Sequence, residues 1–337
     1  MPQAYVPFPR AAHDGAFPES APIDEQLRFM LNYAVLAPSV MNSQPWRFRV
    51  AGSEVFLYAD RSRALPALDP DSRELVISCG AALLNLRLAV RHYGYSVSFE
   101  AVDDPGQPDL IAALSAGKPT PATRDEEALF AAIPRRHTER RPFAEMEVPR
   151  GMLRDLEQDA SAEGARLHVF AGAGEKAELG ALVGDAMRRL AGNAGAKADV
   201  AAWLRPDGDP RPDGVRDSRQ NEWAWRSDSR IPVEPVAVGM TALAAGSPAI
   251  LLLSTRSDDA RSWLDSGQAL ERVLLRATMH DLAASYLNQV TEEPATRMKL
   301  MEKTDGAYPQ VMFRVGHPIP RGGTQRRRVT EVIDAGA

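Results

Sequence analysis

The stretch Arg135-Arg136-His137-Thr138-Glu139-Arg140-Arg141-Pro142-Phe143 places four guanidiniums, an imidazole and a hydroxyl within seven residues. Arg136, Thr138 and Arg140 alternate, so an extended segment would turn all three side chains to one face. Two guanidiniums on either side of a hydroxyl suit a phosphate group, because paired N–H donors match two phosphate oxygens at once. Taken alone, the stretch is more simply interpreted as a solvated charge run before a helix. The phosphate-binding interpretation is favoured only by features elsewhere in the chain.

Length, composition and charge limit the class of protein. The chain has 337 residues, enough for two domains or for one large core with insertions, and its 44% hydrophobic and 25% charged content is ordinary for a soluble globular protein. A formal net charge of -5 argues against a general nucleic-acid binder, so we expect the basic stretch to face one small anion. The single cysteine, Cys79, excludes an internal disulfide or a multi-thiolate metal site, and we expect it in the core.

Neither a secretory signal nor a membrane span is predicted. Residues 1–22 lack the apolar run of a signal peptide and are expected to form an N-terminal arm. Glycine and proline interrupt the longest uncharged run, 235–255, and its most apolar part, 249–253, has only the length of a buried strand. We therefore expect a cytoplasmic protein with no membrane partner.

Apolar periodicity and turn residues divide the chain into helices and strands. The predicted helices cover 23–36, 74–93, 126–133, 148–163, 263–282 and 297–303, with a further helix ending near 190 and a helical stretch over 192–204. The predicted strands cover 46–50, 54–59, 96–102, 166–170, 249–253 and 311–315. Residues 103–125, rich in proline, glycine, alanine and threonine, are expected to contain the join between two halves.

Residues 205–230 are polar and irregular but contain Trp223 and Trp225. Long irregular insertions in compact proteins are often lids over a site. Two indole rings favour a segment that folds down onto the protein, either as a lid or as a loop that the rings merely anchor.

The two long helices align without gaps, with Gly80 opposite Gly267 at an offset of 187 residues (267 − 80). Each half also begins with a helix that leads to a strand, yet the unusual residues are complementary. Only the first half has the turn 38–46, and only the second begins with the basic stretch. This pattern suits a fused pseudo-dimer that keeps one of the two sites that a symmetric dimer would build.

Two motifs resemble those of a known family. Ala37-Pro38-Ser39-Val40-Met41-Asn42-Ser43-Gln44-Pro45-Trp46 resembles the flavin-contacting turn of the nitroreductase superfamily. The segment Arg136-His137-Thr138-Glu139-Arg140 resembles that family's FMN-phosphate motif, with Thr138 where the family usually has serine. Their order is inverted relative to a single-unit nitroreductase, as a fused repeat requires. The chain length and the ending Arg326-Arg327-Arg328-Val329-Thr330-Glu331-Val332 resemble the Acg branch.

The resemblance implies an α+β fold of two tandem repeats, each with a mostly antiparallel sheet flanked by helices, together forming a pseudo-dimer. The first nitroreductase-like half would cover 23–118. The second would cover 119–337, with a lid-like insertion around 184–235. We expect such a chain to be a monomer, because it completes its site without a second copy.

The same resemblance implies that FMN lies between the halves. The residues expected around its phosphate are Arg136, His137, Thr138, Arg140, Arg326 and Arg327. Those expected around its ring and ribityl chain are Pro38, Ser39, Val40, Asn42 and Gln44. The Leu287-Asn288-Gln289 turn falls where the family sets a main-chain N–H against flavin N5. No catalytic side chain and no metal are expected.

The implied activity is a ping-pong NAD(P)H oxidoreductase that passes electrons through flavin N5 to a small nitroaromatic or quinone acceptor. The flavin carries this chemistry, so no protein acid or base is required. The sequence also shows no evident paired-carboxylate or Ser-His-Asp constellation. Two alternatives stay open: flavin storage beneath a closed lid, and binding of a phosphopeptide or nucleic acid without flavin.

Overall fold

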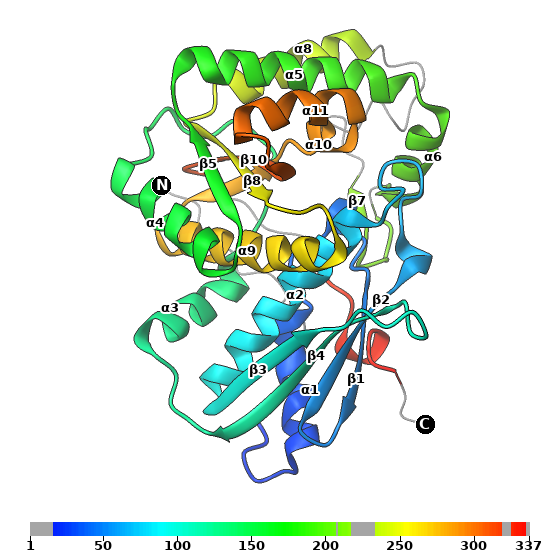
Figure 1. Ribbon diagram of the computed structural model, residues 1–337, viewed down its shortest axis with the longest axis vertical. Helices are drawn as coiled ribbons and strands as arrows, with labels where there is room; N and C mark the ends of the chain where they lie inside the picture. Colours follow the sequence, from blue (N-terminus) through cyan, green and yellow to red (C-terminus); the bar gives the residue numbers. More distant parts are fainter. Residues whose placement is uncertain (1–15, 207, 217–232, 319–324, 335–337) are drawn as a thin grey trace.

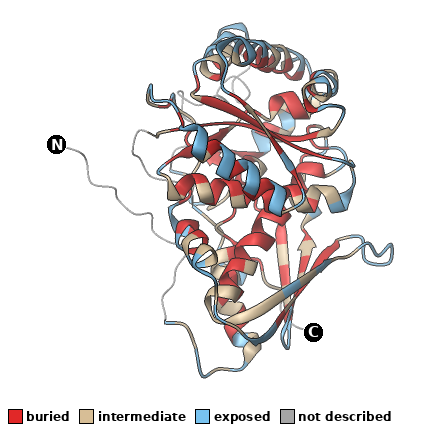
Figure 2. Ribbon diagram, turned by 60° about the vertical axis from the view of Figure 1, so that its left-hand side comes forward, coloured by how far each residue is buried: buried red, intermediate tan, exposed pale blue. Residues whose placement is uncertain are grey.

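Two antiparallel sheets, one from each half of the chain, lie at opposite ends of the molecule with two long helices between them (Figure 1). The computed structural model describes residues 16–206, 208–216, 233–318 and 325–334, which are the described residues throughout. Buried residues gather on the sheets and on the long central helices (Figure 2). The expected α+β class with two tandem sheet-and-helix repeats is confirmed.

The first half forms a four-stranded sheet in the order β1-β2-β4-β3, with antiparallel neighbours throughout. Burial alternates along β1 and β2, as expected for strands with one face against a core. The elements of this half are α1 (Ile23–Ala34), β1 (Trp46–Ala51), β2 (Glu54–Ala59), α2 (Arg73–His92), β3 (Tyr95–Ala101) and β4 (Leu110–Pro119).

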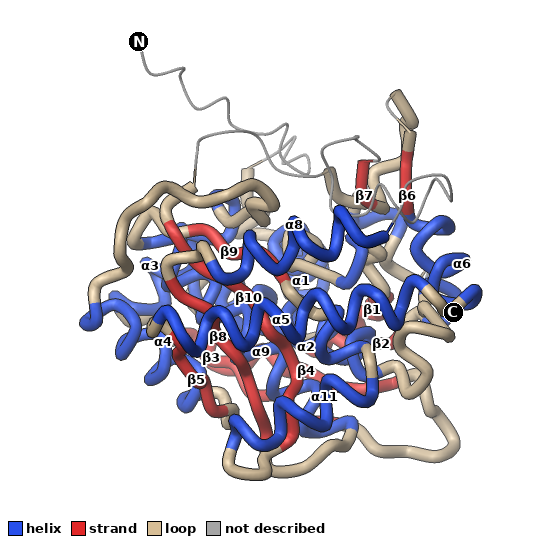
Figure 3. The backbone as a smooth tube through the Cα atoms, turned by 90° about the horizontal axis from the view of Figure 1, so that it is seen from above, coloured by secondary structure: helices blue, strands red, loops and turns tan. Residues whose placement is uncertain are grey.

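The second half forms a sheet in the order β5-β8-β10-β9, again antiparallel. Helices α5 and α8 run side by side over one face of this sheet (Figure 3). Its main elements are α3 (Arg124–Ala132), α4 (Arg150–Ala162), β5 (Arg166–Phe170), α5 (Ala173–Ala191), α6 (Ala194–Trp203), α8 (Val233–Ala245), β8 (Ala249–Thr255), α9 (Ala260–Met279), β9 (Ala283–Tyr286), α10 (Gln289–Glu292), α11 (Pro294–Met301) and β10 (Tyr308–Gly316).

The predicted helices and strands are present, with ends shifted by a few residues, but strands β4 and β9 and helices α8 and α10 were not predicted. The stretch 103–125, expected to be a join, contains the ten-residue strand β4, which pairs with both β2 and β3. The uncharged run 235–255 contributes most of helix α8 as well as strand β8. The expected turn Leu287-Asn288-Gln289 lies between strand β9, which ends at Tyr286, and the short helix α10, which begins at Gln289.

The described part of the predicted insertion, 184–235, is largely regular. It contains the end of α5, helix α6 and a parallel pair of two-residue strands, β6 (Leu204–Arg205) and β7 (Val215–Arg216). The positions of Trp223 and Trp225, on which the lid interpretation depends, lie outside the described residues, as does most of the expected N-terminal arm.

The two halves meet where α2 crosses α9, and glycines make that approach possible. A Cβ atom on Gly80 would lie 3.0 Å from the Cα atom of Gly267 and would clash with the carbonyl oxygen of Leu264. A Cβ atom on Gly267 would in turn clash with the carbonyl oxygen of Ile77. The glycine pair aligned in the sequence is therefore a backbone-to-backbone contact. Although α2 is long and apolar enough to cross a membrane, it is mostly buried inside the protein, as is Cys79.

The C-terminal segment returns to the first half and lies beside β1 (Figure 1). The Phe48 N–H donates to the carbonyl of Val332 at 2.8 Å, and the Asp334 N–H donates to the carbonyl of Phe48 at 2.8 Å. The Arg47 guanidinium lies 3.2 Å from the Asp334 carboxylate. Residues 325–334 therefore contact the first half, so the predicted division into 23–118 and 119–337 does not separate two independent units.

Candidate functional site

The turn that joins α1 to β1 has an unusual backbone. Met41, Asn42 and Gln44 all have positive φ, between 48° and 53°. Non-glycine residues rarely adopt this left-handed conformation, which costs on the order of 1 kcal/mol or more each. The turn is held by the Ser39 hydroxyl, which accepts the Gln44 N–H at 2.9 Å, and by the Ser78 hydroxyl of α2, which accepts the Val40 N–H at 3.2 Å. Such strain persists where the surrounding structure fixes a functional shape.

The basic stretch runs beside the end of the second sheet. Thr138 forms a parallel bridge with Ala284 of β9, and the Glu139 N–H donates to the Ala284 carbonyl at 2.9 Å. Thr138 and Arg140 face the same pocket, in agreement with the alternation of an extended segment. Glu139 is buried and pairs with Arg141 at 2.5 Å, so the Arg141 guanidinium is used in an ion pair with its neighbour.

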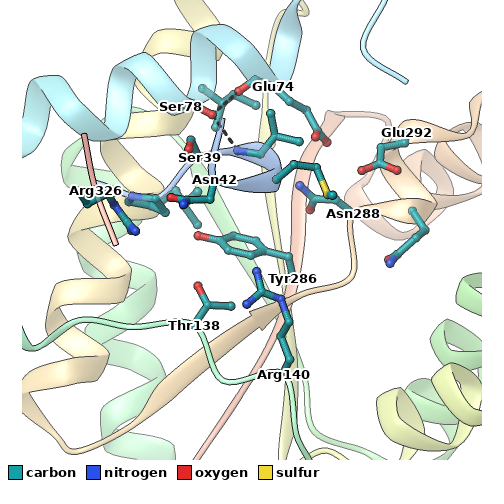
Figure 4. Close-up of a pocket in the computed structure, with 16 residues that line it drawn as sticks. Ser39, Asn42, Glu74, Ser78, Thr138, Arg140, Tyr286, Asn288, Glu292 and Arg326 are labelled. Atoms are coloured by element: carbon teal, nitrogen blue, oxygen red, sulfur yellow. Dashed lines mark hydrogen bonds between the residues drawn. The ribbon is translucent and has the colours of Figure 1, made fainter. Parts of the chain in front are cut away.

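These two segments line one pocket between the halves (Figure 4). It encloses about 860 Å³ free of protein atoms, including space open to solvent. The predicted site residues that line it are Pro38, Ser39, Val40, Asn42, Thr138, Arg140, Asn288 and Arg326. The other lining residues are Met41, Glu74, Ile77, Ser78, Leu270, Tyr286, Gln289 and Glu292.

Arg136 is not among the lining residues, although the alternation predicted it. Its Nη2 donates to the carbonyl of Leu36 at 2.9 Å, and its Nε lies 3.4 Å from the Glu271 carboxylate on α9. Both side chains are almost fully buried. Burial raises the pKa of Glu271 to about 7, against the opposing pull of Arg136. The neighbouring His137 turns its Nδ1 to within 3.3 Å of the Arg135 carbonyl and does not line the pocket either.

Arg326 brings a guanidinium from the C-terminal segment to the pocket. Its Nε donates to the carbonyl of Ala37 at 3.2 Å, close to the end of α1. Burial, together with the charges of Arg136 and Arg140, lowers the pKa of Arg326 to about 9, while Glu271 acts in the opposite direction. Three guanidiniums are thus concentrated around one side of the pocket, and an anion placed there would reduce their mutual repulsion.

Three more predicted residues hold the site from outside the pocket. Gln44 is fully buried, its Oε1 accepts the Arg327 N–H at 2.7 Å, and Arg327 Nη1 donates to the Gln44 carbonyl at 3.2 Å. These two residues therefore fasten the C-terminal segment to the turn. Leu287 lies in the core, and its N–H donates to the Met312 carbonyl at 2.8 Å. Since that N–H is already bonded within the sheet, Leu287 is not the main-chain donor that the resemblance implied.

A loop from the second half is fastened to the strained turn. Asn42 Nδ2 donates to the carbonyl of Gly214 at 3.1 Å, and the Gly214 N–H donates to the Asn42 carbonyl at 3.1 Å. Asp213 forms ion pairs with Arg63 of the first half and, at 2.9 Å, with Arg205. We call residues 204–216, without 207, the latch.

The pocket presents polar atoms that have no hydrogen-bond partner among the described residues. Asn42 Oδ1 and the Tyr286 hydroxyl are both of this kind. Buried polar atoms are normally satisfied, so these two atoms, which face a pocket, are free to bond to water or to a bound molecule. Burial raises the pKa of Tyr286, so its hydroxyl keeps its proton and can donate a hydrogen bond.

Sequence reasoning missed Glu74, Glu292 and Tyr286. Glu74 is in the first turn of α2, where an acidic residue is ordinary for a helix and gives no signal. Glu292 ends α10, a short helix that was expected to be part of a turn. Burial, with a further contribution from Glu292, raises the pKa of Glu74 well above its usual range. Glu74 and Glu292 thus place two carboxyl groups, which the sequence did not reveal, on the wall of one pocket.

Known proteins resemble the chain over nearly its whole length. "Putative NAD(P)H nitroreductase Rv3131" of Mycobacterium tuberculosis is 31% identical and covers 96% of each chain. "Putative NAD(P)H nitroreductase acg" of the same organism is 28% identical and covers 94% of this chain and 97% of its own. The FMN-dependent nitroreductase NfnB of Mycobacterium smegmatis, solved with NADPH, matches 63% of this chain at 16% identity and a TM-score of 0.42. No protein-family model matches the chain.

Proposed function

The chain belongs to the nitroreductase family and has Acg-like relatives, and from this premise we propose that it is an FMN-dependent NAD(P)H oxidoreductase. Its substrates would be NAD(P)H and a small organic electron acceptor of the nitroaromatic or quinone type. Full-length relatives carry the name NAD(P)H nitroreductase, which supports the electron donor and the class of reaction.

One observation carries the proposal: a single pocket joins the strained turn of the first half, with Arg326 beside it, to Thr138 and Arg140 on the opposite side. An elongated molecule with an anionic end and a polar ring can bind the arginines with one end and the strained turn with the other. FMN has this form, and its donors and acceptors match the unsatisfied Asn42 Oδ1 and Tyr286 hydroxyl. A phosphopeptide or nucleic acid would use the arginines and leave the turn without a ligand.

In this proposal Thr138, Arg140 and Arg326 bind the phosphate directly. Arg136 and His137 lie in the same segment but do not line the pocket. Ser39 and Asn42 bind the ring and the ribityl chain, and Pro38 and Val40 shape the turn around them. Asn288, which lines the pocket, replaces Leu287 at the position expected beside flavin N5. Gln44 and Arg327 keep the turn and the C-terminal segment together.

Bound FMN would supply the chemistry for a ping-pong transfer of a hydride and electrons, through N5, between NAD(P)H and a second substrate. The protein positions the ring, neutralises the phosphate and excludes water. The pocket is completed within one chain, so we include in the proposal that the active form is a monomer acting as an intramolecular pseudo-dimer in the cytoplasm.

Flavin storage is the second candidate function, and the latch favours it. Its bond to Asn42, which lines the pocket, and its ion pair with Arg63 hold it against the turn. A latch that never opens would shield bound flavin from NAD(P)H and from acceptors, so that no turnover would occur.

The test is made on the purified protein with its native cofactor. An absorption spectrum of oxidised flavin, released as FMN on denaturation, is the expected first result, and a protein that stays colourless after incubation with FMN would refute the cofactor assignment. Under anaerobic conditions, bleaching by NADPH followed by reoxidation with 1,4-benzoquinone supports the oxidoreductase. Flavin that stays oxidised under excess NADPH supports storage instead.

A further inference from the structure

Two carboxyl groups line the side of the pocket away from Arg326 and Thr138. Glu74 reaches it from the first turn of α2, and Glu292 reaches it from the end of α10 (Figure 4). The two residues are 218 positions apart in the sequence (292 − 74). The pocket therefore has a cationic side and a carboxyl side, and only the cationic side is explained by a phosphate.

The Glu74 carboxyl is held rigidly and has one oxygen to spare. The residue is 3% exposed, and its Oε1 lies 3.0 Å from Nη2 of Arg73. Its Oε2 is buried and has no hydrogen-bond partner among the described residues. The Arg73 guanidinium also donates to the carbonyls of Thr291, at 3.3 Å, and of Gln310, so it binds the carboxyl through Oε1 and leaves Oε2 to the pocket.

The charges around Glu74 favour a bound proton. Burial contributes most to raising the pKa of Glu74, and the charge of Glu292 contributes next. Asp69, whose carboxylate accepts the Glu74 N–H at 3.1 Å, acts in the same direction, and only Arg73 opposes them. Two neighbouring carboxyls, of which Glu74 is buried, do not both ionise freely, so the pair titrates as a unit and retains a proton.

We propose that Glu74, with Glu292 as its partner, is the proton donor of this pocket and hydrogen-bonds to an oxygen of the electron acceptor. This inference rests on the proposed oxidoreductase function, and it makes Glu74 a catalytic residue where the sequence suggested none. Tyr286, another titratable lining group, is less suited, because burial raises its pKa and its hydroxyl retains its proton.

The step balances for a quinone acceptor. Conversion of a quinone to a hydroquinone requires two electrons and two protons. A hydride that originates from NAD(P)H supplies both electrons and one of the hydrogens. The O–H bond of Glu74 breaks, a new O–H bond forms on the quinone oxygen, and the carboxyl pair gains one negative charge until water returns a proton.

Infrared spectroscopy tests the stored proton without any turnover. At pH 7 we expect a band of a protonated carboxyl group in the wild-type protein, which disappears in Glu74→Gln and persists in Glu147→Gln, an exposed carboxyl on the surface. A wild-type spectrum at pH 7 without a band that depends on Glu74 would overturn the proposal. This measurement does not require FMN, so it remains decisive even where the proposed function fails.

Rapid mixing of the two half-reactions tests the donor role in the flavin-loaded protein. In Glu74→Gln we expect reduction by NADPH within about twofold of wild type, whereas reoxidation by 1,4-benzoquinone slows on the order of 100-fold, as for loss of a general acid. The wild-type reoxidation rate should fall as the pH rises through the titration of the pair. In Glu292→Gln that fall should occur at lower pH, because the neighbouring negative charge is gone.

The outcomes separate the two proposals. If the wild-type protein does not bind FMN or does not oxidise NADPH, the proposed oxidoreductase function is refuted. If Glu74→Gln turns over and its reoxidation rate is unchanged, only the proton-donor role of Glu74 is refuted. If Glu74→Gln does not fold, the pH profile of Glu292→Gln decides, and a profile identical to that of the wild type counts against the pair.

Discussion

The Cα atom of Gly267 lies 3.0 Å from the position that a Cβ atom on Gly80 would occupy, so the two halves touch backbone to backbone. We expect Gly80→Ala and Gly267→Ala each to lower the free energy of unfolding by about 1–3 kcal/mol or more, because an inserted methyl in a packed core forces the helices apart. Urea denaturation measures this. Gly239→Ala on α8, where a Cβ atom meets nothing within 4 Å, is the matched control and should be neutral or slightly stabilising. Equal stability of all four proteins would show that the crossing tolerates a wider separation.

Arg140 lines the pocket beside Thr138, and its removal should weaken FMN binding. Charge-assisted hydrogen bonds contribute about 1.5–3 kcal/mol each, so Arg140→Ala should raise the FMN dissociation constant roughly ten- to a hundredfold. Fluorescence titration of the flavin-free protein checks this. Arg154→Ala, which removes an exposed arginine on α4, should bind FMN as the wild type does. Undiminished affinity in Arg140→Ala would count against the phosphate assignment.

The buried carboxyl of Glu271 makes stability depend on pH. Its pKa rises from 4.5 in the unfolded chain to about 7 in the folded protein. Between these values the unfolded chain has released its proton while the folded protein retains it, so stability decreases as the pH rises from about 4.5 to about 7. The decrease is on the order of 3 kcal/mol for this group.

Glu271→Gln removes this titration, so its stability relative to the wild type should improve steadily as the pH rises from about 4.5 to about 7. Chemical denaturation at several pH values measures the difference. A constant offset between the two proteins would mean that the Glu271 carboxyl does not change its protonation on folding. An offset that grows in the opposite direction would mean that Arg136 keeps it ionised.

The latch depends on Asp213, which pairs with Arg63 across the halves and with Arg205 within the loop. Asp213→Ala leaves both guanidiniums without this partner and should loosen the latch, because a half-buried charge network is costly to break. We expect FMN release to become about tenfold faster, measured by dilution of the flavin-loaded protein. Asp209→Ala, whose carboxylate pairs with the exposed Arg211 of the same loop, should release FMN at the wild-type rate. The same rate in both variants would show that the latch does not retain the flavin.

Local motifs explain which site residues could be predicted. Pro38, Ser39 and Asn42 belong to one short turn, and Thr138 and Arg140 to one extended segment, so neighbouring residues determine where they point. Arg136 differs because its direction is set by Leu36 and Glu271, and neither partner can be recognised from the sequence around it.

The missed features depend on contacts between distant parts of the chain. Strand β4 contains alanine, glycine and proline and looks like a linker, but it is stabilised by β2 on one side and β3 on the other. Glu74 and Glu292 become a pair only when α10 is placed against α2. Contacts between distant parts of one chain cannot be recognised from local composition or periodicity, which is why the carboxyl side of the pocket was missed.

The return of residues 325–334 to β1 has a mechanical consequence. A single proteolytic nick between β4 and α3 would leave two fragments joined by the helix crossing and by the main-chain bonds of Phe48. Such fragments should migrate together on a sizing column and separate only in denaturant. Co-expressed as two polypeptides, they should reassemble by complementation.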